Sequence, residues 1–586
     1  MTSLNELYQQ ELDLLKQSAK TFSDEYPALT TNLVRDSTDP DVDMILKGVA
    51  YLTAQLRKEI TDDFPVALQA LSQVLTPSLM QPSPAATIMD FTPKANLLKP
   101  FVISAGKEFD TLPLARDAAG NPVHCRFANV WDVTALPISV QSVSHRVIER
   151  NIDGSQRKLQ QLNIEFDASR NDLANYEFDK LRFYFDLPQA QSTTWMSLFS
   201  QHLESVNVID ANGERHLPSA SVGLAGFDTD NDLAQDSGSS SVHKLLQEYF
   251  LFPEKFGFLD ISLAQWQQRS GAQFSLVFEF KQPNWAVPDL KAENIRLFAA
   301  PAVNYFSGYA EPVKLSGFDT EIRLSARNRA LAGDQKLEII AVETVETVQR
   351  GREQSRAFQN LLKPQFLSDD QAGYHFYQRH GDQDDETVPW LALHQVSRAE
   401  EVLRVGLICC NGELGAKVAP GDVRNATGSS PELVTFTNLT AGSQFHPASV
   451  VSESAWQVVS DQALSLSSIN NGAQLKQLLA HHIPAKLKDS ARQKTNLHQI
   501  NSIDSLVVLN TEIIRQGKLI RGCEYRVVVN GEHFTSAGEL FLFGSLLDQL
   551  FGLQMSLNNF SRLTVTDLQT GDSSEWSTRL GATWAI

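Results

Sequence analysis

The aromatic side chains of the sequence gather in one stretch, Tyr249-Phe250-Leu251-Phe252-Pro253-Glu254-Lys255-Phe256-Gly257-Phe258. Five of these ten residues are aromatic, in a chain that is 9% aromatic overall. Each buried ring removes about 150–250 Å² from water, so we expect the stretch in a hydrophobic core. Pro253 ends any helix begun before it, and the alternation of Phe256 and Phe258 is typical of a strand. The stretch therefore predicts a helix, a proline corner and a strand. A platform that stacks a ligand is the alternative interpretation of the rings.

Length and composition predict a folded protein of several domains. A chain of 586 residues suggests about four domains, and a hydrophobic content of 42% is enough for several cores. The formal net charge of −19 disfavours a sequence-independent grip on nucleic-acid phosphates, because such a grip needs Lys and Arg. We therefore expect no nucleic-acid partner.

Cysteine usage and hydropathy predict a cytoplasmic protein that does not insert into a membrane. Four cysteines in a chain of this length, with no Cys-x-x-Cys motif, favour a reducing compartment. Acidic residues occupy the N-terminal segment, where a signal peptide would have basic and apolar ones. No run of 18 apolar residues occurs, and residues 540–557 are predicted to form a buried helix rather than a membrane span.

Residues 1–84 are predicted to form a helical arm. Ser3 and Glu6 have the spacing of a capping box, and Asp39-Pro40 and Pro65 mark the starts of two further helices. The first helix carries an apolar stripe with two interpretations, because it either packs on its own chain or meets a helix of another subunit. The candidate partner-binding residues are Leu4, Leu7, Tyr8, Leu14 and Leu15.

From Ala85 onward the apolar residues alternate as in strands, between turns of Gly, Pro, Asn and Asp. This pattern predicts a β-rich domain over residues 85–300, with the aromatic stretch in its core, and a second one over residues 301–460. Residues 461–586 are predicted to form an α+β domain, because strand, turn, helix and strand signals follow one another there. The predicted fold class is therefore multidomain α+β, with a helical N-terminal arm, a β-rich body and an α+β C-terminal unit.

A polar stretch, residues 226–241, is predicted to be a solvated loop that is dispensable for folding. Asp228, Asp230 and Asp232 suggest a calcium site, but Leu233 and Ser239 stand where an EF-hand needs Gly and Glu. We therefore expect no calcium ion here.

No catalytic or metal-binding motif is found in the sequence. It has no His-Glu-x-x-His, Gly-x-Ser-x-Gly, phosphate-binding or dinucleotide-binding pattern. His375, His380, His481 and His482 are predicted to be surface or helix-cap residues. We expect neither catalytic residues nor a cofactor or metal. Carboxylates brought together only by the fold leave one alternative open, a cytosolic carbohydrate-active enzyme on a β-sandwich.

The aromatic stretch resembles the signature of the TssF (VasA/ImpG) family, which supplies baseplate subunits of the bacterial type VI secretion system. Three more stretches resemble the family in its own order: residues 299–306 with Pro301-Ala302-Val303-Asn304, residues 403–412, and residues 521–565. The opening, from Leu4 to Met89, is similar as well.

The resemblance implies a non-catalytic wedge subunit, similar to the wedge proteins of contractile phage tails. Family members work in the cytoplasm against the inner membrane, at the membrane-anchored secretion apparatus. The implied partners are TssG, TssK, TssE, the VgrG hub and a second copy of the chain within the wedge. The wedges form the platform on which sheath and inner tube assemble, and a rearrangement of the platform triggers contraction.

Overall fold

The computed structural model describes residues 4–25, 44, 47–55, 80–152, 155–168, 172–227, 232–233, 241–315, 320–326, 328, 331, 337–349, 355–362, 372–380, 387–394, 401–448, 469–483, 490–515 and 517–581. The chain divides into two compact units. The first comprises Met1–Leu75 with Val450–Ala463, and the second comprises Thr76–Ser449 with Leu464–Ile586. The fold is multidomain α+β, as predicted, whereas the division into four domains stays a prediction.

The described part of the first unit is helical. Helix α1 (Leu4–Glu25) confirms the first predicted helix, and residues 47–55 are helical where the second was expected. The predicted caps at Ser3 and Asp39, and the third predicted helix after Pro65, lie outside the described residues.

A six-stranded sheet joins distant parts of the second unit. Its centre is the antiparallel pair β1 (Ala86–Pro93) and β17 (Ala299–Val303), with Ile88 opposite Pro301. Because β1 is paired along both edges and covered on both faces, its first six residues are buried. The boundary predicted between residues 300 and 301 falls inside β17. The order of strands is β26 (Val423–Ala426), β3 (Glu108–Thr111), β6 (Arg126–Asn129), β17, β1 and β27 (Val434–Asn438).

Two further sheets and helix α4 (Gln189–Gln201) share a hydrophobic core with the six-stranded sheet. Each of these elements contributes large side chains to this first core. Examples are Phe91 from the six-stranded sheet, Phe166 from the five-stranded sheet, Phe183 from the four-stranded sheet and Trp195 from α4. The five-stranded sheet runs β12 (Gly213–Leu217), β11 (Leu203–Asp210), β15 (Gln273–Lys281), β9 (Ser155–Asp167) and β8 (Ser139–Ile152). The four-stranded sheet runs β13 (Val222–Ala225), β14 (Phe258–Ser262), β10 (Lys180–Phe185) and β16 (Ile295–Arg296).

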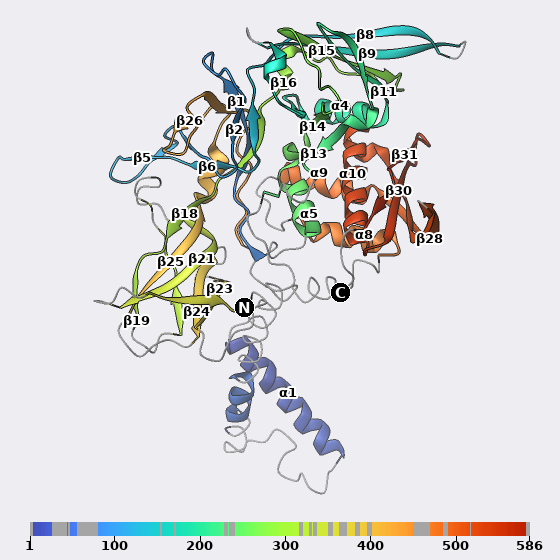
Figure 1. The fold of residues 1–586 in the computed structure, drawn as a ribbon. Helices are drawn as coiled ribbons and strands as arrows, with labels where there is room; N and C mark the ends of the chain where they lie inside the picture. The colour runs from blue at the N-terminus through green and yellow to red at the C-terminus, as the bar shows by residue number, and fades with distance from the viewer. Residues whose placement is uncertain are drawn as a thin grey trace. The chain divides into compact units, whose positions relative to one another are not determined.

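Two short antiparallel pairs complete this region. Strand β2 (Phe101–Ile103) pairs with β7 (Val133–Ala135), and β4 (Ala115–Arg116) pairs with β5 (Pro122–Val123). Figure 1 shows β8 and β9 as a long hairpin that extends from one end of the five-stranded sheet.

An eight-stranded sheet encloses a core of its own. Its strand β25 (Glu401–Cys410) matches the buried strand predicted at residues 403–410, with Leu403, Val405 and Leu407 inside the core. The order is β18 (Phe306–Tyr309), β25, β21 (Glu338–Gln349), β22 (Ser355–Asn360), β23 (Gly373–His380), β24 (Thr387–His394) and β20 (Glu321–Arg323), and β19 (Val313–Leu315) also pairs with β25.

The C-terminal part confirms the predicted succession of strand, turn, helix and strand. Strand β29 (Lys518–Val529) leads through α10 (Ala537–Gln554) to β30 (Asn559–Asp567), and the two strands pair in parallel. The strands β28 (Ile503–Arg515), β31 (Ser573–Glu575) and β32 (Arg579–Leu580) belong to the same sheet. This sheet, α10 and the helices α8 (Gly472–Ala480) and α9 (Ser490–Asn501) are together called the C-terminal layer.

Helix α10 is covered on several sides, as its apolar sequence predicts. Two of its glycines allow close neighbours, because a Cβ at Gly538 would overlap the backbone of Thr193 in α4. A Cβ at Gly544 would likewise overlap the ring of Trp576. Helices α4 and α10 therefore lie side by side, as Figure 1 also shows.

The aromatic stretch forms the predicted helix, proline corner and strand: α5 (Ser241–Leu251), a 3-10 turn at Pro253–Phe256, and β14. All five rings are buried. Tyr249, Phe250 and Phe256 lie in the second core, which α5 shares with the C-terminal helices and strands, whereas Phe252 and Phe258 lie in the first core. The stretch therefore packs into two cores at once, which favours the core interpretation over a ligand platform.

Candidate partner-binding surfaces and buried polar sites

Helix α1 presents part of its apolar stripe to solvent. Leu14 is 51% exposed, and Tyr8 and Leu15 are half-buried. The side chains of Leu4 and Leu7 lie outside the described residues. The assignment of these five residues to partner binding stays a prediction.

The second helical segment of the first unit also exposes large apolar side chains. Val49, Tyr51 and Leu52 are exposed there, whereas Ala50 and Ala54 are fully buried. The small residues thus face inward and the large ones face water, which is the reverse of an ordinary amphipathic helix. Exposed large apolar side chains on one short helical segment are a feature of interaction sites on soluble proteins.

Sequence stretches that resemble the TssF family meet in the interior rather than at the surface. The aromatic stretch and the C-terminal stretch share the second core, where the ring centroids of Tyr249 and Phe543 lie 6.4 Å apart. The other two stretches meet at Asn304 and Asn411, one residue after β17 and β25 respectively.

Asn304 and Asn411 form a buried polar network where the chain crosses between the six-stranded and eight-stranded sheets. Asn304 Nδ2 donates to Asn411 Oδ1 at 2.8 Å, and the Asn411 backbone N–H donates to Asn304 Oδ1 at 2.9 Å. The two side chains also donate to the carbonyls of Arg126 and His124. Sequence reasoning missed this network, although a polar residue inside an otherwise apolar run was a signal for both asparagines.

The structure describes two central residues of the predicted solvated loop (residues 226–241), Asp232 and Leu233, and both contact α5. Asp232 Oδ2 lies 3.6 Å from Lys244 Nζ, and the Leu233 backbone N–H donates to Glu248 Oε1 at 2.5 Å. Glu248 also accepts from Lys255, which is fully buried. These contacts disfavour the prediction that the whole loop is dispensable for folding, because the charged groups buried beneath it gain partners from it.

Burial and the neighbouring Glu248 carboxylate raise the pKa of Asp232 to about 6. The two lysines oppose this shift but do not cancel it. The carboxyl therefore binds a proton more tightly in the folded chain than in the unfolded one.

His243 and His482 form a buried pair, so a surface position for His482 is ruled out, whereas its bond to a carbonyl in the last turn of α8 agrees with the predicted helix-cap role. Their rings stack at 5.1 Å, and His243 Nδ1 lies 2.9 Å from His482 Nε2. His482 Nδ1 must carry a hydrogen, because it bonds to the Leu478 carbonyl at 2.9 Å. His482 Nε2 then accepts from His243 Nδ1–H. Burial lowers the pKa of both imidazoles, to about 3 for His482.

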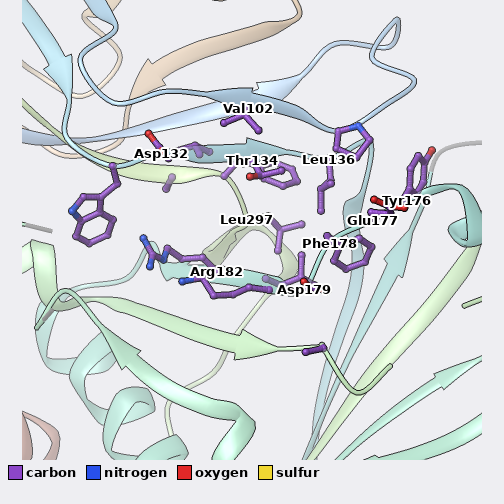
Figure 2. A pocket seen from close by; sticks show the side chains of 18 of the residues that line it. Val102, Asp132, Thr134, Leu136, Tyr176, Glu177, Phe178, Asp179, Arg182 and Leu297 are labelled. Carbon is purple, nitrogen blue, oxygen red and sulfur yellow. The ribbon is translucent and has the colours of Figure 1, made fainter. Parts of the chain in front are cut away.

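A groove of about 1320 Å³ lies beside the short β2–β7 pair. Figure 2 shows Val102, Thr134 and Leu136 on one side and Asp179 and Arg182 on the other. Three exposed carboxylates, of Asp132, Glu177 and Asp179, lie along the groove.

The groove's cations are already engaged by the protein itself. Arg182 binds Asp260 through two hydrogen bonds, of 2.6 and 2.8 Å, and Lys180 donates to the same carboxylate. Arg269 donates to the backbone carbonyls of Tyr176 and Phe178. The charge that remains available in the groove for a binding partner is therefore mainly negative.

Neither metal clusters nor membrane-spanning helices are found in the part of the chain that the structure describes. No three His, Cys, Asp or Glu side chains there are grouped to hold a metal ion. None of the described helices is long and apolar enough to cross a membrane.

Comparisons with known proteins give one consistent result. The family described as "Type VI secretion system, TssF" matches residues 1–583. A relative from Pseudomonas aeruginosa, described as type VI secretion system component TssF1, is 22% identical over 633 residues and covers 99% of both chains.

Two solved structures share the fold. A chain of a TssK-TssF-TssG baseplate subcomplex has a TM-score of 0.74 at 21% identity, over 92% of this chain and 98% of that chain. A chain of the baseplate complex from the type VI secretion system has a TM-score of 0.58 at 19% identity, over 100% of both chains.

Proposed function

Because the chain belongs to the TssF family of the type VI secretion system, we propose that it is a structural wedge subunit of a bacterial secretion baseplate. The observation that carries the proposal is the family match over residues 1–583, which leaves almost none of the chain for another function. The solved relatives have the same fold in a baseplate assembly, one of them together with TssK and TssG.

The partners that follow are TssG and TssK, with TssE, the VgrG hub and a second copy of this chain as finer proposals. The exposed apolar residues of the first unit, Leu14 and Leu52 among them, support docking to other subunits. The setting is the cytoplasmic side of the inner membrane, at the anchored apparatus. In this role the chain acts by shape and buried interface area, as a platform for tube and sheath.

The alternative, a carbohydrate-active enzyme, needs an acid of raised pKa beside a second carboxylate in a deep cleft. The groove beside β2 and β7 has carboxylates, but Asp132, Glu177 and Asp179 are all exposed. The described residues of the groove therefore do not favour catalysis.

Affinity purification of the tagged chain from its own bacterium tests the proposal. We expect TssG-family and TssK-family proteins to co-purify, and co-expression with the TssG-family protein to increase the soluble yield of this chain. Recovery of the chain without any secretion-system protein, under conditions in which the apparatus is assembled, would contradict the proposed function.

A further inference from the structure

The hairpin of β28 and β29 extends beyond the rest of its sheet. The two strands pair as far as Arg515 opposite Lys518, whereas β30 pairs with β29 only from Arg521 onward. The hairpin tip, the described part of residues 511–521, therefore extends beyond Arg521 as two strands with no third strand among the described residues. Ile514 and Leu519 lie directly opposite each other in this tip and are 77% and 60% exposed. A two-stranded ribbon is only marginally stable alone, and such an apolar pair in water favours docking.

The hairpin tip is also basic, in a chain whose net charge is −19. Arg515, Lys518 and Arg521 are exposed, and Glu512 is the one carboxylate among residues 511–521. Glu512 pairs with Arg521 at 3.1 Å, whereas Arg515 and Lys518 make no ion pair with any described residue. The tip thus combines an apolar pair with two cations whose charge is not compensated.

The groove beside β2 and β7 has the complementary properties. Its carboxylates are exposed, and its own cations are engaged by Asp260 and by backbone carbonyls. Val102, which is 55% exposed, supplies apolar surface at the groove, whereas Leu136 and Leu297 line it from the buried core. The hydroxyl of Tyr176, a buried residue of the lining, has no hydrogen-bond partner among the described residues.

The size of the groove fits a polypeptide better than a small molecule. Pockets for small molecules are typically about 300–1,000 Å³, and this groove is larger.

We propose that the hairpin tip of one copy of this chain docks into the groove of a second copy. Arg515 and Lys518 would then face the carboxylates of Asp132, Glu177 and Asp179, and the Ile514–Leu519 pair would leave water. If a two-fold axis relates the two copies, the dimer contains this contact twice. Without a two-fold axis, repeated contacts produce a ring or an open chain of copies. The proposed function includes a second copy of this chain as a partner, and the inference says where that copy binds. It rests on the proposed function only in assuming that the two copies belong to one assembly.

Charge reversal with rescue tests the contact on the full chain alone. We expect R515E/K518E and E177K/D179K each to weaken self-association, measured by analytical ultracentrifugation, by at least about tenfold. A mixture of these two variants pairs each reversed tip with a reversed groove, and we expect it to restore association to within about threefold of the original chain. The matched control is R157E/K158E, which reverses two exposed cations on the β8–β9 hairpin. It should associate like the original chain.

A second measurement needs no variant. Isotope-labelled and unlabelled copies of the original chain are mixed and coupled with a carbodiimide, which joins amines to carboxylates in direct contact. We expect mixed-isotope peptides that link Lys518 to Glu177, Asp179 or Asp132.

Three outcomes would overturn the inference: equal association of all variants, no rescue in the mixture, or mixed-isotope links that connect other surfaces only. Circular dichroism and melting temperature identify a variant that fails to fold, in which case the coupling result alone decides. Because these assays contain no partner protein, their failure leaves the partner purification unaffected, and the converse also holds.

Discussion

Asn304 and Asn411 hydrogen-bond to each other although 107 residues separate them in the sequence. Each asparagine lies at a point where the chain passes between the six-stranded and eight-stranded sheets, after β17 and after β25. The pair therefore links the two connections between the sheets. Its remaining hydrogen bonds are donated to the carbonyls of His124 and Arg126 and accepted from the Arg126 backbone N–H, at the start of β6.

The first prediction concerns this pair. Asn304→Ala removes the acceptor of the buried Asn411 backbone N–H and the side-chain donor to the Arg126 carbonyl, so we expect a loss of at least about 2 kcal/mol in the free energy of unfolding. A double-mutant cycle with Asn411→Ala should give a coupling energy of roughly 1–3 kcal/mol by urea unfolding. Asn284→Ala, at an exposed position, is the control and should change stability by less than about 0.5 kcal/mol. Additive effects of the two core substitutions would contradict the network.

The second prediction concerns α1 as an assembly element. Changing Leu7 and Leu14 to Asp should leave the melting temperature unchanged and abolish or greatly weaken co-purification with TssG-family and TssK-family proteins. The reason is that unpaired charges in a desolvated interface cost several kcal/mol of association free energy, on the order of 3–5. The measurements are circular dichroism and pull-down.

Gln9→Asp with Lys16→Asp is the matched control for α1, because both residues are exposed and have the same seven-residue spacing. This control should bind the partners normally. If the Leu7 and Leu14 variant unfolds while its folded fraction still binds, the helix belongs to the internal core of the chain.

The third prediction revises the expectation for residues 226–241. Replacing the whole loop by a Gly-Ser linker removes Asp232 and Leu233 from α5 and should lower the melting temperature clearly. Replacing only residues 234–240 should leave it nearly unchanged, since a change in loop length costs about 0.6 kcal/mol per doubling. Equal melting temperatures for the two replacements would mean that the contacts of Asp232 and Leu233 contribute nothing.

Asp232 itself gives a pH dependence with a definite sign. Its carboxyl has a pKa of about 6 in the folded chain and an ordinary value of 3.8. The stabilising effect of its proton is therefore complete below pH 3.8 and is lost as the pH rises through 6. In Asp232→Asn, this part of the pH dependence should disappear from urea-unfolding curves recorded between pH 4 and 7.

The fourth prediction concerns the His243–His482 pair, whose effect on stability changes with pH in the opposite direction. The unfolded imidazoles bind protons near pH 6.5, whereas folded His482 does so only at about 3. The free energy of unfolding should therefore fall as the pH drops below 6.5, by up to about 1.4 kcal/mol per pH unit for each proton. His482→Gln should reduce this slope.

His394→Gln, at an exposed strand end, is the control for the histidine pair and should retain the slope. His481, the neighbour of His482, also lowers the pKa of His482 by its charge, so it is kept unchanged in both variants. An identical pH slope in His482→Gln and the original chain would contradict the buried, neutral pair.

Local patterns predicted the elements well and the long-range contacts poorly. The helix of α1, the helix–proline–strand of residues 241–262 and the β29–α10–β30 succession follow from periodicity and from proline and glycine positions. The strand partners do not follow, because β17 pairs with β1 across more than two hundred residues and no local signal encodes that choice.

Polar groups were the hardest to predict. Asp232 lies in a stretch with the composition of a solvated loop, and only its tertiary neighbours, Lys244 and Glu248, show that it is partly buried. The adjacent His481 and His482 likewise differ only in what packs on them. Sequence alone gives the chemical type of such groups, whereas burial decides their protonation.

The division of the aromatic stretch between two cores has a mechanical consequence. Tyr249, Phe250 and Phe256 are held on one side and Phe252 and Phe258 on the other, within ten residues of backbone. Sliding one core against the other would pull rings out of both, and each buried Phe contributes roughly 1.5–3 kcal/mol. The stretch therefore holds the two cores together rigidly and does not act as a hinge. We expect a force on the C-terminal layer to move the first core with it.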